Sequence, residues 1–131
     1  MMVFIDTSAI LAVLDVGDVN HAAAKALWEK TILAGDVLVC HNYILVETSA
    51  LISRRLGIEA VRVFESDIVP ILWVEWVTRD VHNAAVGALL VAARRTLSLV
   101  DCVSFEVMRK TGIGAAFAFG RHFQEYGYEL I

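Results

Sequence analysis

The sequence Met2-Val3-Phe4-Ile5-Asp6 sets the fold, because four consecutive apolar residues end at a carboxylate. A short, unbroken apolar run is typical of a strand that is covered on both faces, as in a parallel sheet. No basic residue precedes the run, so the N-terminus is expected to be a first strand and not a signal peptide. Asp6 then stands at the carboxyl end of this strand, where α/β folds bind their ligands.

Strand and helix patterns alternate along the rest of the chain. Further apolar runs predict strands at residues 36–40, 71–76, 115–119 and 128–131. Helical periodicity and capping residues predict helices that begin near Asp18 or Asn20, at Asn42, after Gly57, at Thr78 or Asp80, and at Asp101. Buried strands that alternate with helices indicate one α/β domain over residues 1–131, in three layers, with a mostly parallel five-stranded sheet between the helices.

The composition restricts the class of protein. The net charge of −4 argues against a protein that coats nucleic acid by bulk electrostatics, although local basic patches remain open. No uncharged apolar stretch approaches the roughly 20 residues that span a bilayer, so no membrane association is expected. The hydrophobic content of 58% therefore indicates a buried sheet plus an apolar interface, in a homodimer or with a partner.

The two cysteines, Cys40 and Cys102, have neither metal-ligand nor redox spacing. Each lies in apolar surroundings in the sequence. Free, buried thiols are typical of proteins in a reducing compartment. A cytoplasmic location is therefore expected.

Three carboxylates stand in places that require an explanation. Asp6 follows the first strand, Glu47 interrupts an apolar helix face, and Asp101 opens an apolar helix. Simpler roles exist for each: Asp6 and Asp101 can cap helices, and Glu47 can reach solvent or pair with Arg54. If the three gather at one edge of the sheet, they raise one another's pKa unless a cation is present.

The type of ligand narrows the chemistry of such a site. Carboxylate oxygens without clustered His or Cys favour Mg²⁺ or Mn²⁺ over Zn²⁺. A cation of this kind can polarise a phosphoryl oxygen and generate hydroxide from water. The three acids together therefore predict metal-dependent hydrolysis of a phosphodiester.

Four short motifs occur in order: FIDTSA at 4–9, VETSA at 46–50, LSLVDCVSF at 97–105 and FAFGRHF at 117–123. Together they resemble the ordered motifs of PIN domains, and most of all those of VapC-type toxins from bacterial and archaeal toxin–antitoxin pairs. The resemblance covers essentially the whole chain. It implies a parallel five-stranded sheet, Mg²⁺-dependent endoribonuclease activity on RNA, dimerisation, and inhibition by a cognate antitoxin protein.

Matched residue by residue, the resemblance assigns roles to five side chains. Asp6, Glu47 and Asp101 correspond to the family's first three acidic positions and are expected to be the catalytic ligands of Mg²⁺, with Mn²⁺ as a substitute. Ser8 corresponds to a hydroxyl position that helps to hold a ligand or its water. Ser104, one helical turn after Asp101, is expected to act in the same way.

Further expectations concern the rim of the site and the surface. Arg121 and Arg54 are candidate contacts for RNA phosphates. The helices expected at residues 43–56 and 58–68 are candidate elements of a homodimer. By analogy with the family, an antitoxin is expected to place an arginine near the acidic site.

Gly120 departs from the family's pattern. PIN domains usually have a second aspartate after the Phe-x-Phe strand, where this chain has glycine. The site is therefore expected to carry three formal negative charges where the family has four, and to hold one metal ion firmly. Two functions stay open: an active ribonuclease toxin, or a catalytically weakened PIN domain that binds RNA or a partner protein without cutting.

Overall fold

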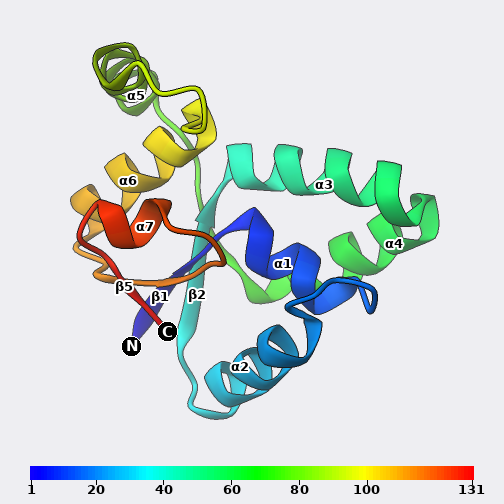
Figure 1. Ribbon diagram of the computed structural model, residues 1–131. Coiled ribbons are helices and arrows are strands. Elements are labelled where there is room, and N and C mark those ends of the chain that lie inside the picture. The colour runs from blue at the N-terminus through cyan, green and yellow to red at the C-terminus, as the bar shows by residue number, and fades with distance from the viewer.

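A computed structural model describes all residues, Met1–Ile131. The sheet lies at the centre of the molecule, with helices on both of its faces (Figure 1). The strands are β1 (Met2–Ile5), β2 (Val37–His41), β3 (Trp73–Glu75), β4 (Ala115–Phe117) and β5 (Glu129–Leu130). Their order is β3-β2-β1-β4-β5, and every pair of neighbours is parallel. The predicted three-layer α/β domain is confirmed, and its sheet is wholly parallel.

The order in which the chain forms the strands of the sheet decides which face each helix covers (Figure 1). The helices on one face are α1 (Thr7–Leu14), α2 (His21–Leu33), α3 (Asn42–Leu56) and α4 (Ile58–Val63), and those on the other are α5 (Arg79–Ala92), α6 (Leu99–Thr111) and α7 (His122–Glu125). The chain proceeds from β1 to β2 to β3 and then crosses back to β4 and β5. Because crossovers between parallel strands are right-handed, this reversal moves the later helices to the opposite face.

The central strand β1 defines both the core and the site. Val3, Phe4 and Ile5 are completely buried, as expected for a strand with a helical layer on each face. β1 lies between β2 and β4, so its carboxyl end is the point where the strand order reverses. Asp6 follows directly, at the position where open parallel sheets bind ligands.

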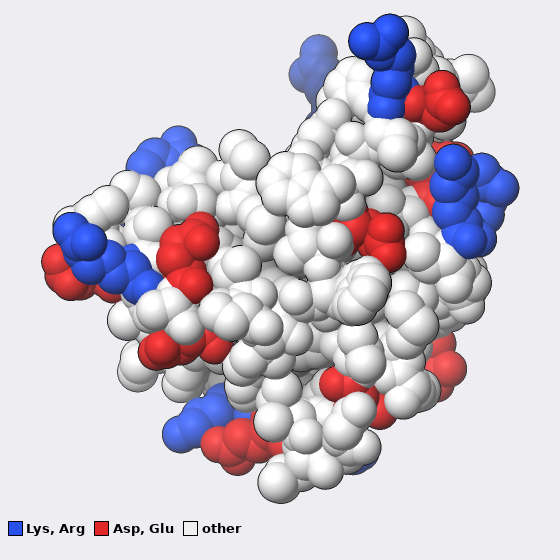
Figure 2. Space-filling view, turned by 180° about the vertical axis from the view of Figure 1, so that it is seen from behind, with Lys and Arg blue, Asp and Glu red and all other residues white.

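The structure places both cysteines inside the protein and distributes the charged side chains unevenly over its surface. Cys40 and Cys102 are free and buried, as expected. None of the helices has the length and apolar character needed to cross a membrane. In Figure 2, Lys and Arg side chains lie towards the margins of the face, and uncharged and acidic side chains occupy its middle.

The start of α3 differs from the prediction. His41, and not Asn42, is the N-cap: its backbone is extended, and its Nδ1 accepts the N–H of Ile44 at 3.3 Å. Asn42 is the first helical residue, and its side-chain oxygen accepts the N–H of Val77 at 2.6 Å. The prediction of Asn42 as cap is therefore wrong, because that side chain instead joins α3 to the segment after β3. The predicted end of α3 at Gly57 is confirmed, with φ at 91°.

The helix predicted after Gly57 is divided. α4 ends at Val63, a π-helical turn spans Phe64–Ile68, and a 3₁₀ turn spans Val69–Ile71. Pro70 lies in the first positions of this 3₁₀ turn, where its fixed φ is tolerated. The third strand is consequently shorter than the predicted 71–76 and begins at Trp73.

His41 makes the stability of the fold depend on pH. The ring is completely buried, and burial lowers the pKa of His41 from its ordinary value of 6.5 to about 3. The unfolded chain therefore takes up a proton at a higher pH than the folded one does. The stability contributed by the neutral ring is fully present above the unfolded pKa and is lost as the pH falls below it.

We expect the free energy of unfolding to fall by about 2 kcal/mol between roughly pH 7 and pH 5 because of this one side chain. Urea unfolding at both pH values, on the wild type and His41→Asn, isolates the effect, since Asn can still accept the Ile44 N–H but does not titrate. The stability difference between the two proteins should shrink by that amount at the lower pH. A difference that does not change with pH would contradict the prediction.

Candidate active site

Asp6 is held at the carboxyl end of β1 by the start of α1, of which it is the N-cap. Its Oδ2 accepts the backbone N–H of Ser8 at 3.1 Å and the Ser8 hydroxyl at 2.6 Å. Burial raises the pKa of Asp6 and the charge of Asp101 raises it further, against the lowering by the Ser8 hydrogen bonds. The capping role is thus confirmed, and the same carboxylate belongs to an acidic group.

Ser8 connects Asp6 to the segment that follows β4. Its Oγ donates to Asp6 and accepts the backbone N–H of Phe119 at 3.0 Å. Asp6 also donates its own backbone N–H to the carbonyl of Phe117 at 3.0 Å. The first and the last sequence motifs are therefore joined through Ser8, which fixes the orientation of the Asp6 carboxylate.

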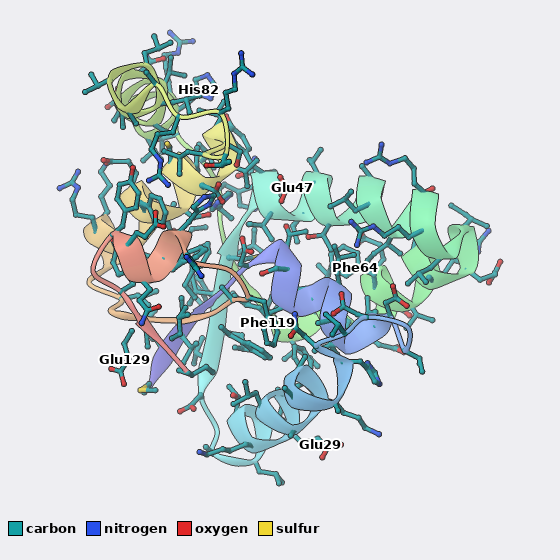
Figure 3. All side chains as sticks on the ribbon, in the orientation of Figure 1. Glu29, Glu47, Phe64, His82, Phe119 and Glu129 are labelled. Carbon is teal, nitrogen blue, oxygen red and sulfur yellow. The ribbon has the colours of Figure 1, made fainter.

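Glu47 approaches from α3, on the half of the helix that is next to the start of α1 (Figure 3). It is half-buried. Burial raises the pKa of Glu47, and the charges of Asp6 and Asp101 raise it further, while the Thr7 hydroxyl lowers it. Glu47 therefore lies within electrostatic reach of both other acids.

Asp101 lies in the first turn of α6. Ser98 is the N-cap, and the two residues form a capping box: Ser98 Oγ accepts the N–H of Asp101, and Asp101 Oδ2 accepts the N–H of Ser98, both at 3.0 Å. Nδ1 of His122 lies 3.2 Å from the same Oδ2. The alternative of Asp101 as N-cap is therefore wrong, because it occupies the third helical position, but its carboxylate still organises the helix start.

The three acids come from three separate elements and form an open acidic cluster, in which the charge of Asp101 acts on Asp6 and the charges of both act on Glu47. No group of three or more Asp, Glu, His or Cys side chains stands at ligating spacing. The hydrogen bonds of Asp6 and Asp101 end on Oδ2, which leaves Oδ1 of each carboxylate without such a bond. Negatively charged oxygens that repel one another match a hard divalent cation, which relieves the repulsion.

Two buried threonines lie beneath the cluster. Oγ1 of Thr7 and Oγ1 of Thr48 are 2.9 Å apart, and this hydrogen bond joins α1 to α3. Each threonine is the sequence neighbour of an acid, Asp6 or Glu47. The pair therefore fixes the start of α1 against the middle of α3.

Ser104 does not join the acids. It is completely buried, its Oγ lies 2.9 Å from Nε2 of His41, and its hydroxyl donates to the carbonyl of Val100 at 2.9 Å. Its hydroxyl is closed to solvent and engaged with His41 and Val100, so the role of Ser104 in holding a ligand or its water stays a prediction.

The two candidate phosphate contacts are exposed and belong to none of the ion pairs. Arg121 directly precedes α7, whose first residue, His122, contacts Asp101. Arg54 lies seven residues after Glu47 on α3, about 10 Å along the helix axis. Arg54 is therefore not the counter-ion of Glu47, and Arg121 has the better position.

At Gly120 the side chain of an acid is missing, and the backbone conformation disfavours one. Its φ of +112° is one that L-residues rarely adopt, although a Cβ there would meet nothing within 4 Å. An acid at this position would have space for its carboxylate but a strained backbone. Gly120 therefore supplies no fourth carboxylate, and its backbone conformation disfavours one.

Sequence reasoning missed several polar side chains that arrange the cluster. The spacing of Ser98 and Asp101 is a capping-box signature and could have been recognised. His122, Thr7 and Thr48 carry no comparable local signal, since each meets its partner only through the fold.

Comparison with known proteins identifies the family of the chain. Residues 3–128 match the model of the PIN domain. The 23S rRNA-specific endonuclease VapC20, from two strains of Mycobacterium tuberculosis, is 38% identical over 128 residues, which make up 97% of this chain and 95% of that protein.

Solved structures give the same result. The crystal structure of Mycobacterium tuberculosis VapC20, described as a sarcin-ricin loop cleaving toxin, is similar with a TM-score of 0.85 and 35% identity, over 98% of this chain and 96% of that one. FitAcB from Neisseria gonorrhoeae shares the fold with a TM-score of 0.69 and 11% identity, over 100% of this chain and 96% of that one. The sequence match over nearly the whole length and the shared architecture show that this chain belongs to the PIN-domain family.

Proposed function

We propose that this chain is a metal-dependent endoribonuclease that hydrolyses RNA phosphodiester bonds and is the toxin of a toxin–antitoxin pair. The observation that supports the proposal is the electrostatic coupling of Asp6, Glu47 and Asp101, three acids that belong to three separate elements. The relationship to VapC20, a 23S rRNA-specific endonuclease, supports RNA as the substrate class.

Asp6, Glu47 and Asp101 would hold Mg²⁺, and Mn²⁺ is expected to substitute. A bound ion of this kind supplies charge stabilisation at the scissile phosphate and lowers the pKa of water. Hydrogen bonds to Oδ2 fix the carboxylates of Asp6 and Asp101 and present Oδ1 of each. Glu47 would bind the ion directly or through water and would orient the attacking water.

The proposed partners follow from the rim of the site and from the family. Arg121, exposed beside α7, is the candidate contact for an RNA phosphate, and Arg54 is a more distant one. A cognate antitoxin is the proposed inhibitor, and the cytoplasm, where such an RNA substrate occurs, is the proposed location.

A second function is favoured by Gly120. With three acids where the family usually has four, the chain can be a weakened PIN domain that binds RNA or a partner protein without cutting. The acids form no ready-made group of metal ligands, which is compatible with both functions. Cleavage by the wild type decides between them.

Replacing Asp6 by Asn tests the metal site. The Asn oxygen can still accept the Ser8 hydrogen bonds, but the charge is lost. We expect Mg²⁺-dependent cleavage of a fluorescent RNA oligonucleotide to fall by more than about 100-fold. The melting temperature without metal should stay equal or rise, because repulsion with Asp101 and Glu47 is removed.

Glu29→Gln is the matched control, since it removes one carboxylate charge from an exposed position on α2. It should leave cleavage at the wild-type level. Undiminished activity of Asp6→Asn would overturn the assignment of the acids.

Paired variants at Gly120 separate the two functions. Gly120→Ala and Gly120→Asp share the backbone strain, of about 1–2 kcal/mol, and differ only in the carboxylate. If three acids suffice, both variants should show equal loss of stability and neither should cut RNA faster than the wild type. A large gain of cleavage in Gly120→Asp over Gly120→Ala would instead establish the weakened site.

A homodimer through α3 and α4 is the proposed assembly. Val46 and Ile58 are 69% and 59% exposed, and a surface hollow over α3 is lined by Leu45, Val46, Ser49, Ala50, Ser53 and Glu65. Apolar side chains grouped on two adjacent helices are typical of association surfaces.

Sedimentation velocity at micromolar concentration tests this assembly. The wild type should sediment as a dimer, and Ile58→Lys should weaken association at least about tenfold by burying a charge. Leu90→Lys, on the exposed part of α5, is the control and should have no effect. A monomeric wild type would refute the dimer, and dissociation by Leu90→Lys alone would place the interface on α5.

A further inference from the structure

The buried side chain of His41 joins the two helices that carry Glu47 and Asp101. His41 lies at the corner between β2 and α3, and its Nδ1 accepts the N–H of Ile44 at 3.3 Å. Its Nε2 lies 2.9 Å from Oγ of Ser104, which is on α6. Both side chains are completely buried. None of the chemistry proposed above uses either residue.

The contacts of His41 define a directed chain of hydrogen bonds. Because Nδ1 accepts an amide N–H, the neutral ring carries its hydrogen on Nε2 and donates it to the Ser104 hydroxyl. Ser104 passes its own hydrogen to the carbonyl of Val100 at 2.9 Å. No buried side-chain polar atom in the protein lacks a partner, so this chain is fully satisfied.

Packing prevents the ring from moving away from Ser104. Phe4, in the central strand, lies with its ring centroid 5.8 Å from that of His41. The rings of Tyr43 and His41 meet edge to face, with their centroids 5.9 Å apart. The Tyr43 hydroxyl is itself held by a 2.7 Å hydrogen bond to His82 of α5. The imidazole therefore acts as a rigid spacer.

The two ends of this spacer are close in sequence to the acids. His41 is the N-cap of α3, and Glu47 follows within two turns of that helix. Val100 directly precedes Asp101, and Ser104 lies one turn after it on α6. A change in the distance between His41 and Ser104 would thus move the two helix starts, and with them the two carboxylates.

We propose that His41 is a positioning residue that sets the separation of the Glu47 and Asp101 carboxylates through its hydrogen bond to Ser104, and thereby tunes the affinity of the acidic cluster for a divalent cation. The inference rests on the proposed metal-binding function. Mg²⁺ requires nearly ideal octahedral geometry at short ligand distances, so its binding responds to small shifts of a carboxylate. Residues that orient ligands from behind typically change metal affinity by 10–100-fold.

Three variants separate the two hydrogen bonds of the His41 ring, one to Ser104 and one to Ile44. Ser104→Ala removes the acceptor and leaves the cap of α3 in place. His41→Asn keeps an oxygen for the Ile44 N–H but is too short to reach Ser104. His41→Gln keeps an N–H donor at the position of Nε2 and gives up the cap.

Titration calorimetry with Mn²⁺ on the metal-free protein, without RNA, measures the effect. We expect Ser104→Ala and His41→Asn each to raise the dissociation constant about tenfold. His41→Gln should restore affinity to within about threefold of the wild type. The double variant His41→Asn/Ser104→Ala should bind no more weakly than either single variant, because all three cut the same link.

Thr31→Val is the matched control for a purely structural role. Thr31 is buried in α2, and its hydroxyl donates to the carbonyl of Leu27 at 2.7 Å, the same kind of bond that Ser104 makes to Val100. It should lower the melting temperature and leave Mn²⁺ binding unchanged. If Ser104→Ala also lowers the melting temperature but binds Mn²⁺ like the wild type, the inference is wrong.

The outcomes separate this inference from the function on which it rests. A wild type that binds no Mn²⁺ would overturn the metal site, and the inference with it. A wild type that binds Mn²⁺, with unaltered affinity in the variants, would overturn the inference alone. Ser104→Ala provides the same measurement if His41→Asn does not fold.

Discussion

The mutual repulsion of three carboxylates at the carboxyl end of β1 is the constraint on which the site depends. Burial and neighbouring charge raise the pKa of both Asp6 and Glu47, so the protein holds these groups together at a cost in free energy. The strand order makes this possible, because the chain leaves β1 towards β2 and returns beside it at β4. A cation bound between the acids would relieve the repulsion, which is why an acidic cluster of this kind is better explained by function than by stability.

Polar side chains, and not the acids themselves, keep the arrangement in place. Ser8 joins Asp6 to the segment after β4, the hydroxyls of Thr7 and Thr48 join α1 to α3, and His41 joins α3 to α6 through Ser104. Each of these bonds joins a residue at the start of a helix to a residue at least 41 positions away in the sequence. Helix starts are suitable anchors because their unpaired backbone N–H groups favour nearby negative charge.

The segment after β4 is where this chain departs from its family. Gly120 takes a backbone conformation, with a φ of +112°, that an aspartate would adopt only under strain. His122, two residues later, contacts Asp101 instead. The last motif therefore still contributes to the cluster, through a basic side chain that opposes the charge of Asp101 when protonated and not through a fourth ligand.

The sequence alone determined the alternation of buried strands and amphipathic helices, the buried first strand at Met2–Ile5, and the three acids as candidates for one site, because these depend on local periodicity and on motifs short enough to be recognised along the chain. It did not determine that His41 caps α3, that Ser104 faces that ring, or that His122 reaches Asp101. The cap at His41 is a local contact, but the contacts of Ser104 and His122 join residues that are far apart in sequence, 63 positions in the case of His41 and Ser104. Only the packing of α3 and α6 against the sheet brings them within hydrogen-bond distance, so only the tertiary structure could decide how the acids are held.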